Sequence, residues 1–550
     1  MRHKERGSAL FIAMLIVMVV AALAVVVVSD SVAKAKDADL ENENVRALFV
    51  AESAIDLAMN AVQTGANGKL GTSNWTTASD TVRVDGLPTL GEPHVILQNM
   101  PNDGGEYYTW AMFWGNNGRD DDGDGLMDAA DKDEKYIWTI WAWGRYGNTI
   151  RRIKVIAEYH LVQIWDNAIV AGSGASGMAI NGNATVHGGM LIFAEDAAGN
   201  PTTPPTATNF LFSGAGGVQD NYVGLDPANI ARMRPIGVGP NGLKTYVRLK
   251  HGKAGLSGTG TLGDPAIGLP DDPATIANDQ MTVDGVFITD GYGGNQGASN
   301  VFSDNGPYNP WDLPPSVRFP RLTDPYFDPV TGIEFPSYDA YVASEGLTVT
   351  AATLATYNTA QTNPNNRFRI DADTASFTIG PDAKGNRIQW NTSTNTLTIN
   401  GVINFQQTSG SGDFHLGGKK TGTVPNVNYT GRGTMYIGGT GGDAHIHTNV
   451  VPVGQYLTND TLGFIAKNNL GLADGSGDAQ LSIFGIFRAG NTISSQKQNQ
   501  IMGCSISEYF NMGTNVPKIA HHPDVAANMP PGFNSEPIPT TLYLDAWGEW

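Results

Sequence analysis

The sequence has little cysteine, little charge and a deficit of basic residues. Its single cysteine, Cys504, cannot form an internal disulfide, so cysteine usage gives no support for an oxidising compartment. Only 16% of the 550 residues are charged, and the net charge of −19 repels nucleic acid and anionic lipid headgroups. GxSxG, HExxH and phosphate-binding-loop motifs are absent. These absences favour a binding or structural protein over an enzyme.

Glycine and proline, by contrast, are abundant. The chain has 67 glycines and 30 prolines, which is typical of short strands joined by many turns. A chain of this length has room for about three domains. Cys504 lies in the dense apolar stretch MGCSI, which predicts a buried, inert thiol. We therefore expect a large all-β region.

One long hydrophobic run is present, from Ala9 to Val28. It carries no charge and is long enough, as a helix, to cross the hydrocarbon core of a bilayer. A cleaved secretory signal has a shorter apolar region followed by a small-residue cleavage site, whereas this run is full length and ends at Ser29-Asp30. The run predicts a membrane-spanning helix.

The leader MRHKER, followed by Gly7, Ser8 and the apolar run, resembles the class III signal of type IV prepilins. The resemblance implies that a prepilin peptidase cuts between Gly7 and Ser8 and methylates the new N-terminus. It also implies that the helix stays on the mature protein. The helix would first anchor the protein in the bacterial inner membrane and would later pack against other pilin subunits in a filament.

Two further segments narrow the resemblance. RGSALFIAML and RALFVAESAIDLAMNAV look most like PilX-type minor pilins and the large tip pseudopilin of type II secretion. Major pilins usually carry a glutamate at the fifth mature residue, where this chain has Ile12. The departure implies a subunit with no other subunit above it, at the tip of a filament.

The segment after the apolar run predicts a continuing amphipathic helix within residues 8–65. Apolar residues recur at three, four or seven positions, with acidic and basic residues between them, and Gly65 ends the pattern. A coiled-coil stalk would show the same local pattern over about three heptads, and packing on a small sheet is the preferred interpretation. The predicted apolar face consists of Val45, Leu48, Ile55, Met59 and Val62.

Residues 66–165 predict an α+β pilin head. Three segments rich in aromatic and β-branched residues are expected to be strands, namely Glu106 to Trp114, Tyr136 to Trp143 and Thr149 to Val162. Arg145 to Asn148, with the sequence RYGN, supplies a tight turn between the last two. The resulting antiparallel meander would cover the helix.

An acidic loop between the first two of these strands predicts a structural calcium site. Three alternating aspartates precede Gly125, and this spacing points every second side chain inward around a glycine turn. The loop resembles the DxDxDG repeats of thrombospondin-type proteins more than an EF-hand. A solvated acidic hairpin is the alternative. The predicted ligands are Asp120, Asp122, Asp124, Leu126 through its carbonyl, Asp128 and Asp131.

Residues 166–510 predict a β-solenoid-like domain. Short apolar segments separated by Gly, Asn and Ser would bury a continuous column if they stacked as rungs. A β-sandwich is the alternative. This pattern of short apolar segments separated by small and polar residues resembles the β-solenoid domain of some large competence pilins. Residues 194–366 are expected to form a loop-rich insert, and residues 511–550 a tail whose final strand covers the solenoid or rejoins the pilin sheet.

Three ligand hypotheses concern this domain. His445 and His447 alternate on one strand beside Asp443, which is weak evidence for zinc without a third ligand. An aromatic groove would favour glycan binding. A basic cluster would contact DNA phosphates, with an aromatic ring stacking on a base, or would be ordinary surface charge. The cluster comprises Arg232, Arg234, Lys244, Tyr246, Arg248, Lys250, His251 and Lys253.

The sequence as a whole predicts a long transmembrane and amphipathic α-helix, an α+β pilin head and a large all-β domain. The function expected from the resemblance is that of a minor pilin that initiates or caps a type IV pilus and presents the β domain for adhesion. DNA capture in competence and a role at the tip of type II secretion are the alternatives. A polysaccharide lyase is disfavoured because the carboxylates are dispersed.

Overall fold

The computed structural model divides the chain into two compact units. Unit 1 contains residues 1–121, 127–161 and 539–550, and unit 2 contains residues 122–126 and 162–538. The β-rich unit 2 is thus inserted in the chain before the last strand of unit 1. The structure describes residues 5–64, 81–82, 98–99, 106–113, 135–175, 179–180, 184–202, 208–212, 216–219, 221–233, 243, 245–251, 253–256, 260–262, 281–282, 288–289, 317–328, 330–357, 368–407, 413–418, 426–439, 441–475, 477–495, 497–512, 517–534, 538–539 and 543–549.

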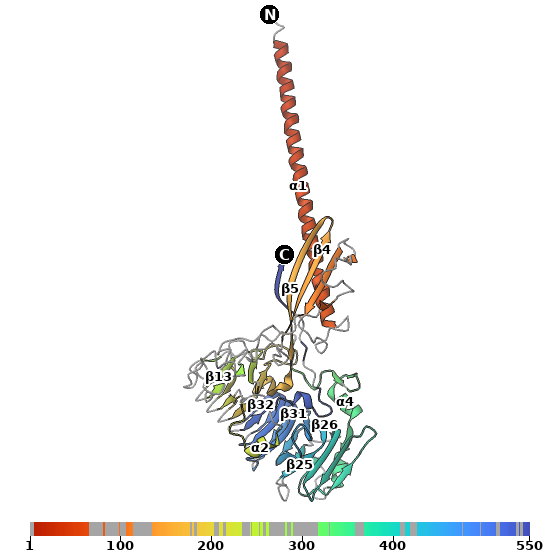
Figure 1. The fold of residues 1–550 in the computed structure, drawn as a ribbon, viewed down its shortest axis with the longest axis vertical. Helices are drawn as coiled ribbons and strands as arrows, with labels where there is room; N and C mark the ends of the chain where they lie inside the picture. The colour runs from red at the N-terminus through yellow and green to blue at the C-terminus, as the bar shows by residue number, and fades with distance from the viewer. Residues whose placement is uncertain are drawn as a thin grey trace. The chain divides into compact units, whose positions relative to one another are not determined.

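Unit 1 is a long helix packed on an antiparallel sheet. The helix extends far beyond the strands that it contacts (Figure 1). The sheet order is β1-β3-β4-β5-β34. In addition, β35 pairs antiparallel with β5, and β2 pairs antiparallel with β3. The final strand therefore rejoins the sheet that packs on the helix, which is one of the two alternatives expected for it. The elements are α1 (Glu5–Thr64), β1 (Thr81–Val82), β2 (Gln98–Asn99), β3 (Glu106–Phe113), β4 (Lys135–Tyr146), β5 (Thr149–Val162), β34 (Ile538–Pro539) and β35 (Tyr543–Glu549).

Small residues form the face of α1 that packs on the sheet. Gly144 of β4 lies so close to the helix that an added Cβ would collide with the backbone of Ala47 and Ala51. Of the predicted face, Ile55 is buried, Leu48 and Met59 are partly buried and Val45 is 45% exposed, while the side chain of Val62 lies outside the described residues. A helix whose backbone approaches the sheet this closely selects alanine rather than larger aliphatics. The buried residues of α1 are Ala47, Val50, Ala51, Ala54, Ile55 and Ala58.

The turn between β4 and β5 is tied to α1. Arg46 donates to the hydroxyl of Tyr146, and its guanidinium lies 4.9 Å from the centre of that ring. The hydroxyl of Thr149 donates to Glu43 Oε2 at 3.2 Å. Gly147 has a φ of 59°, which the two-residue turn requires. The predicted RYGN turn is confirmed, and it holds the helix as well as the two strands.

Unit 2 is built around stacked parallel strands. In the central column each strand pairs in parallel with the strand of the next coil (Figure 1). A β-sandwich would instead pair antiparallel strands. In spatial order the column comprises β19 (Leu347–Thr350), β23 (Thr396–Gln407), β26 (Arg432–Gly439), β29 (Thr461–Ala466), β31 (Ser482–Ser494), β32 (Gln500–Asn511), β6 (Asn167–Ala175), β9 (Gly189–Ile192), β12 (Thr245–Leu249) and β15 (Met281–Thr282).

Two flanking columns complete the coils, and their pairs are again parallel. Long strands such as β31 and β32 contribute to more than one column. The first flanking column contains β20 (Phe368–Ile370), β24 (Phe414–Leu416), β27 (Ala444–Ile446) and β30 (Leu470–Leu472). The second contains β25 (Asn426–Thr430), β28 (Asn449–Pro452), β33 (Lys518–Ala520), β8 (Thr185–His187), β11 (Gly217–Gln219) and β14 (Thr261–Leu262).

The stack is continuous in space but not in sequence. The first coil, β6, pairs with the last long strand, β32, so the chain enters and leaves the stack at the same level. Near these points Trp165 Nε1 donates to the carbonyl of Asn534 at 2.7 Å, and the Trp165 ring packs edge-on against Phe533 at 5.3 Å. Such pairing between distant segments closes the insertion.

This arrangement changes one predicted domain boundary and the predicted role of residues 194–366. Unit 2 ends at Ile538 rather than at residue 510, because β33 stacks between β32 and β8. Described strands within residues 194–366, such as β11 and β12, are coils of the stack rather than decoration. Each is only three to five residues long, so the surrounding Pro and Gly concealed it in the sequence.

Several smaller elements border the stack. A hairpin of β21 and β22 extends it antiparallel to β23, and a second parallel sheet runs β16-β13-β10-β7. The elements are β7 (Ala179–Ile180), β10 (Thr208–Phe212), β13 (Lys253–Leu256), β16 (Ile288–Thr289), β17 (Tyr326–Asp328), β18 (Ile333–Phe335), β21 (Phe377–Ile379), β22 (Arg387–Asn391), α2 (Pro227–Arg232), α4 (Tyr338–Glu345), α5 (Ala351–Ala355), η2 (Ile164–Asp166) and η6 (Ala526–Asn528).

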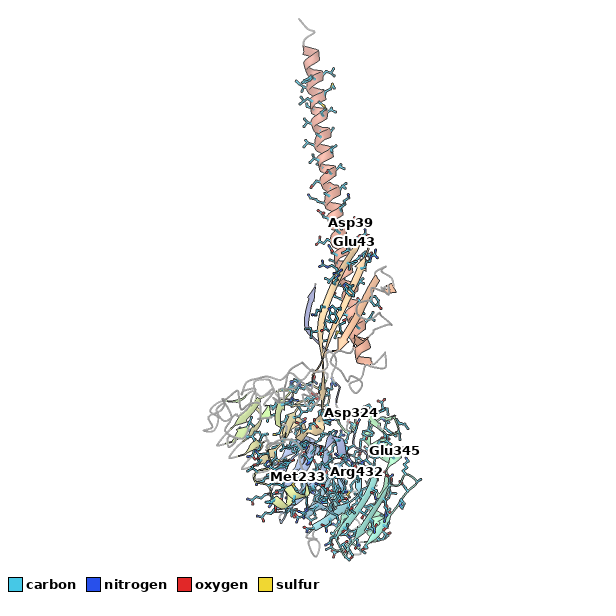
Figure 2. All side chains as sticks on the ribbon, viewed as in Figure 1. Asp39, Glu43, Met233, Asp324, Glu345 and Arg432 are labelled. Carbon is cyan, nitrogen blue, oxygen red and sulfur yellow. The ribbon has the colours of Figure 1, made fainter. Side chains whose placement is uncertain are left out.

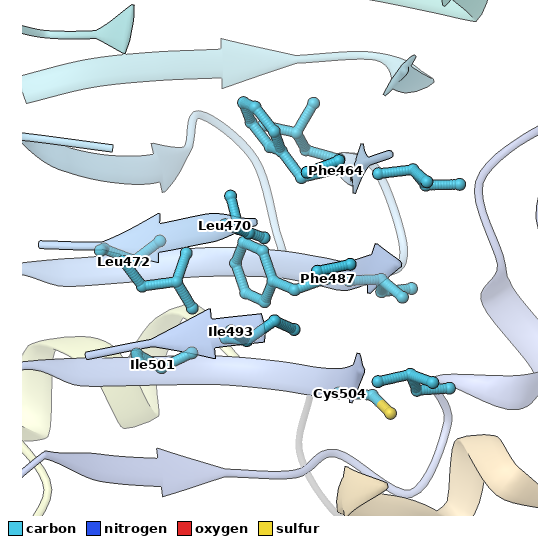
Figure 3. Close-up of a cluster of buried hydrophobic side chains, with 14 of the residues drawn as sticks. Phe464, Leu470, Leu472, Phe487, Ile493, Ile501 and Cys504 are labelled. Atoms are coloured by element: carbon cyan, nitrogen blue, oxygen red, sulfur yellow. The ribbon is translucent and has the colours of Figure 1, made fainter. Parts of the chain in front are cut away.

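The central strands of unit 2 are covered on both faces. Inward side chains such as Phe464 and Phe487 are fully buried and form register partners on neighbouring coils (Figure 3). The opposite face of β26 is covered by the end of η6 and the segment after it, where Arg432 donates to the carbonyls of Asn528 and Met529. Cys504 is also fully buried, as predicted, and burial raises the pKa of its thiol.

Candidate functional site

The N-terminal half of α1 is the first candidate surface. Between Leu10 and Val28, each large apolar side chain is at least 47% exposed. These side chains project from a helix that no other part of unit 1 covers (Figure 2). The helix is long and apolar enough to cross a membrane, and none of its most hydrophobic window is buried in the protein. Gly7 and Ser8, the predicted cleavage pair, lie within α1, and their side chains are outside the described residues.

The predicted calcium loop lies outside the described residues. The loop connects β3, which ends at Phe113, to β4, which begins at Lys135, and the structure describes both strands. Binding of Ca²⁺ stays a prediction. The ligands in question are Asp120, Asp122, Asp124, Leu126, Asp128 and Asp131.

The predicted basic cluster is used partly inside the fold. Lys250 Nζ lies 2.7 Å from Glu195 Oε2 and donates to the carbonyl of Val317, with side-chain exposures of 4% for Lys250 and 0% for Glu195. Arg248 is 8% exposed, and Arg232 is partly exposed at the end of α2. For the remaining members, Arg234, Lys244, Tyr246 and Lys253, no side chain is among those described.

Three histidines gather on the outer face of the first flanking column. His415 of β24 is the register partner of His445 of β27, and His447 follows two residues after His445. Burial alternates along this strand, so Ala444 and Ile446 face the core while both histidines face outward. The three rings are nearly parallel, with centroids 4.9 to 5.8 Å apart. We call these residues, with Asp474 and Asp478, the histidine cluster.

Carboxylates fix the orientation of two of the rings. His445 Nδ1 lies 2.9 Å from Asp474 Oδ2, and His447 Nδ1 lies 2.6 Å from Asp478 Oδ2. The Asp478 carboxylate also accepts a hydrogen bond from the Gly475 amide at 2.8 Å. Asp474 and Asp478 follow β30, so they come from the next coil. The cluster therefore joins side chains from three successive coils.

Two glycines make room for these carboxylates. A Cβ at Gly471, the register partner of His445, would collide with the Asp474 carboxylate. At Gly475 it would meet both the Asp478 carboxylate and the Nδ1 atom of His447. The carboxylates thus fold back into space that any other residue would fill.

Negatively charged carboxylates surround His445 and stabilise its protonated form. Burial lowers the pKa of His445, but the hydrogen bond that its ring donates to Asp474 and the charges of Asp474, Asp413 and Asp443 outweigh it and raise this pKa above its ordinary value. Burial raises the pKa of Asp474, but the hydrogen bond and charge of His445, and the charge of His447, outweigh it and lower that pKa.

The second histidine pair, by contrast, belongs to the core. His521 is 3% exposed, and its Nε2 donates to the carbonyl of Trp165 at 2.8 Å. Burial lowers the pKa of His521 to about 4, so the ring is neutral at physiological pH. Its neighbour His522 is 1% exposed.

Sequence reasoning found His445 and His447 but missed their partners. A repeated pattern carried the missing information, since Gly-Asp-Phe-His ends at His415 and Gly-Asp-Ala-His ends at His445. The repeat spans one coil of the stack, which puts equivalent residues side by side. Asp474 and Asp478 lie in the next coil, directly after β30, where the repeat no longer holds, and the pattern alone does not find them.

No protein-family model and no curated protein matches this sequence. Among solved structures, the chain is similar to the crystal structure of the competence-associated pilin ComZ from Thermus thermophilus. The two are 16% identical in sequence, with a TM-score of 0.49, and the match covers 92% of this chain and 97% of that chain.

Proposed function

We propose that this protein is a minor subunit of a type IV pilus. The observation that carries the proposal is the division of α1, whose N-terminal half is bare and apolar while its C-terminal half packs on an antiparallel sheet. Exposed aliphatic surface of this extent needs lipid or other apolar helices to cover it. The inner membrane would cover it before assembly, and other pilin subunits would cover it in the filament.

We place the subunit at the pilus tip. Ile12 stands where the family resemblance implies a glutamate that engages the preceding subunit, and its side chain is 57% exposed. The β domain is inserted between β5 and the returning strand β35, both strands of the pilin sheet. A domain of this size would be hard to repeat in a tightly packed filament, which supports one or a few copies at the cell-surface end.

For the β domain we propose surface or adhesive binding rather than catalysis. DNA capture needs an exposed row of cations, and two of the predicted ones, Arg248 and Lys250, are largely buried. Glycan binding would be favoured by an exposed groove lined with aromatic residues such as Tyr292, Tyr308 and Trp311, and these lie outside the described residues. The proposal for the β domain is therefore surface binding without a specified ligand.

Mass spectrometry and filament imaging test the proposal. Co-expression with a prepilin peptidase should remove residues 1–7 and methylate Ser8, whereas Gly7→Val should block cleavage and the control Ile12→Val should not. Antibody labelling of purified pili should then mark filament ends. An uncleaved chain would overturn the pilin assignment, and uniform labelling along the shaft would overturn the tip assignment.

A further inference from the structure

The histidine cluster has no part in helix packing or in filament assembly as described above, yet its geometry is that of a metal site. One ligand atom from each of His445, His447 and Asp474 lies within 4.8 Å of the others. Two ligands on one tetrahedral zinc ion lie roughly 3.3 Å apart, given metal–ligand distances of about 2.0–2.2 Å. Side-chain displacements of up to about 1.5 Å would close that difference, which is within the range that partly exposed side chains allow.

The tautomer of His447 is already set for coordination. A carboxylate only accepts hydrogen bonds, so the contact with Asp478 places the His447 proton on Nδ1. In that tautomer Nε2 carries the lone pair and accepts a hydrogen bond from His415 Nδ1 at 3.0 Å, which a metal ion would replace. Carboxylate-held histidines of this kind are the usual supporting shell of protein metal sites. Asp478, 7% exposed and held by the Gly475 amide, is a rigid support.

The surrounding charges favour a cation. Asp474 and Asp478 contact the rings directly, and Asp413 and Asp443 act on His445 electrostatically. The nearest cation in register is Arg369 of β20, which pairs with His415 and so lies two strands from His445. A Cβ at Gly418 would lie 3.7 Å from Arg369 Nη1 and 3.3 Å from His447 Cδ2, so the guanidinium lies near the cluster. The four carboxylates therefore act on the site together with one nearby arginine.

We propose that His445, His447 and Asp474 bind one divalent transition-metal ion of the zinc class, supported by Asp478 and with His415 beside it. Two imidazoles and a carboxylate suit Zn²⁺ and its neighbours, whereas Ca²⁺ and Mg²⁺ prefer oxygen ligands. The ion would link His445 and His447 of one coil to Asp474 of the next. Three protein ligands leave a further position for water.

Zinc titration of the full-length protein in detergent tests this proposal. After metal removal, a chelator-competition titration should find one Zn²⁺ per chain at this site, and zinc should raise the melting temperature. Asp474→Asn should weaken binding more than ten-fold while keeping a hydrogen-bonding group beside His445. Asp478→Asn, which removes only the support of His447, should weaken it about ten-fold.

Two controls separate this site from other sources of binding. His251→Ala removes a partly exposed histidine elsewhere in the β domain and should leave zinc affinity unchanged. The paired change Asp122→Ala and Asp124→Ala removes the predicted calcium loop and should also leave it unchanged. Equal affinity of the wild type and a His445→Ala, His447→Ala variant would overturn the proposal, as would the absence of zinc binding to the wild type.

Discussion

The two units of this protein treat apolar surface in opposite ways. In unit 1, α1 leaves its aliphatic side chains from Leu10 to Val28 open and buries mostly alanines against the sheet. In unit 2, every residue of β29 is buried, because coils cover one face and the segment after η6 covers the other. Unit 1 therefore depends on other molecules to cover its hydrophobic surface, whereas unit 2 covers its own.

This difference locates function in each unit. On α1 the exposed apolar residues are the functional surface, because lipid or a neighbouring helix must cover them. On unit 2 the apolar residues hold the fold together, and chemistry is left to outward polar groups such as those of the histidine cluster. Substitutions of the same type in the two units should consequently have very different effects on folding, and the following experiments compare them in pairs.

The largest expected difference concerns two phenylalanines. Phe487 is fully buried between coils, so Phe487→Ala should lower the free energy of unfolding of the β domain by about 3–5 kcal/mol through lost burial and a residual cavity. Phe49 on α1 is 60% exposed, so Phe49→Ala should change that free energy by less than about 0.5 kcal/mol. Denaturant titration of the full chain in detergent, followed by circular dichroism, measures both.

Incorporation into pili should show the reverse order for these variants. Phe49→Ala should reduce the amount of protein recovered in filaments, since it removes apolar surface that a neighbouring subunit would cover. A large loss of stability on Phe49→Ala would contradict the division between an open helix and a closed domain.

Ion pairs provide the second comparison. Lys250→Met leaves Glu195 buried without its cation and should destabilise the β domain by about 3–5 kcal/mol. Lys34 pairs with Asp30 at 2.9 Å on α1, but both side chains are more than half exposed, so Lys34→Met should have no measurable effect on unfolding. Thermal and denaturant unfolding of the two variants, side by side, measure the difference.

A double variant separates the buried charge from the shape of the site. Glu195→Gln combined with Lys250→Met removes both charges and should recover part of the lost stability, because no unpaired charge remains buried. The Glu195 side chain also accepts from the Phe319 amide at 2.6 Å, a contact that glutamine retains. If the double variant is as unstable as Lys250→Met alone, the loss comes from packing and not from the buried carboxylate.

Much of the fold was predictable because its signals are local. The hydrophobic run, the strand from Thr149 to Val162 and the RYGN turn each rest on a few neighbouring residues, and the structure agrees with all three. The pairing of β6 with β32 was not predictable, and the return of β35 to the sheet of unit 1 was one of two alternatives that the sequence left open. These contacts join segments far apart in the chain, and their alternation fits several partners equally well.

The candidate site shows the same limit. The alternation of His445 and His447 placed both on one face, which the structure bears out. The third ligand, Asp474, depends on the length of the intervening coil and on the space left by Gly471. A Gly-Asp-x-His repeat of one coil length would have added His415, but no local rule identifies a carboxylate that folds back from the next coil.

The smallest expected effect concerns two glycines of the pilin sheet. Gly144 lies against the backbone of α1, so Gly144→Ala must push Ala47 and Ala51 away and should cost about 1–3 kcal/mol of unit 1 stability. A Cβ added at Gly548 of β35 would meet no atom of the described residues within 4 Å, so Gly548→Ala should change stability by less than about 0.5 kcal/mol.

Hydrogen exchange of the amides in α1 and β4 reports on unit 1 alone. Faster exchange in Gly144→Ala, with no change in the β domain, would show that small residues hold the helix to the sheet. Equal exchange in both variants would mean instead that the contacts of Arg46 and Glu43 at the turn hold α1 without the close approach at Gly144.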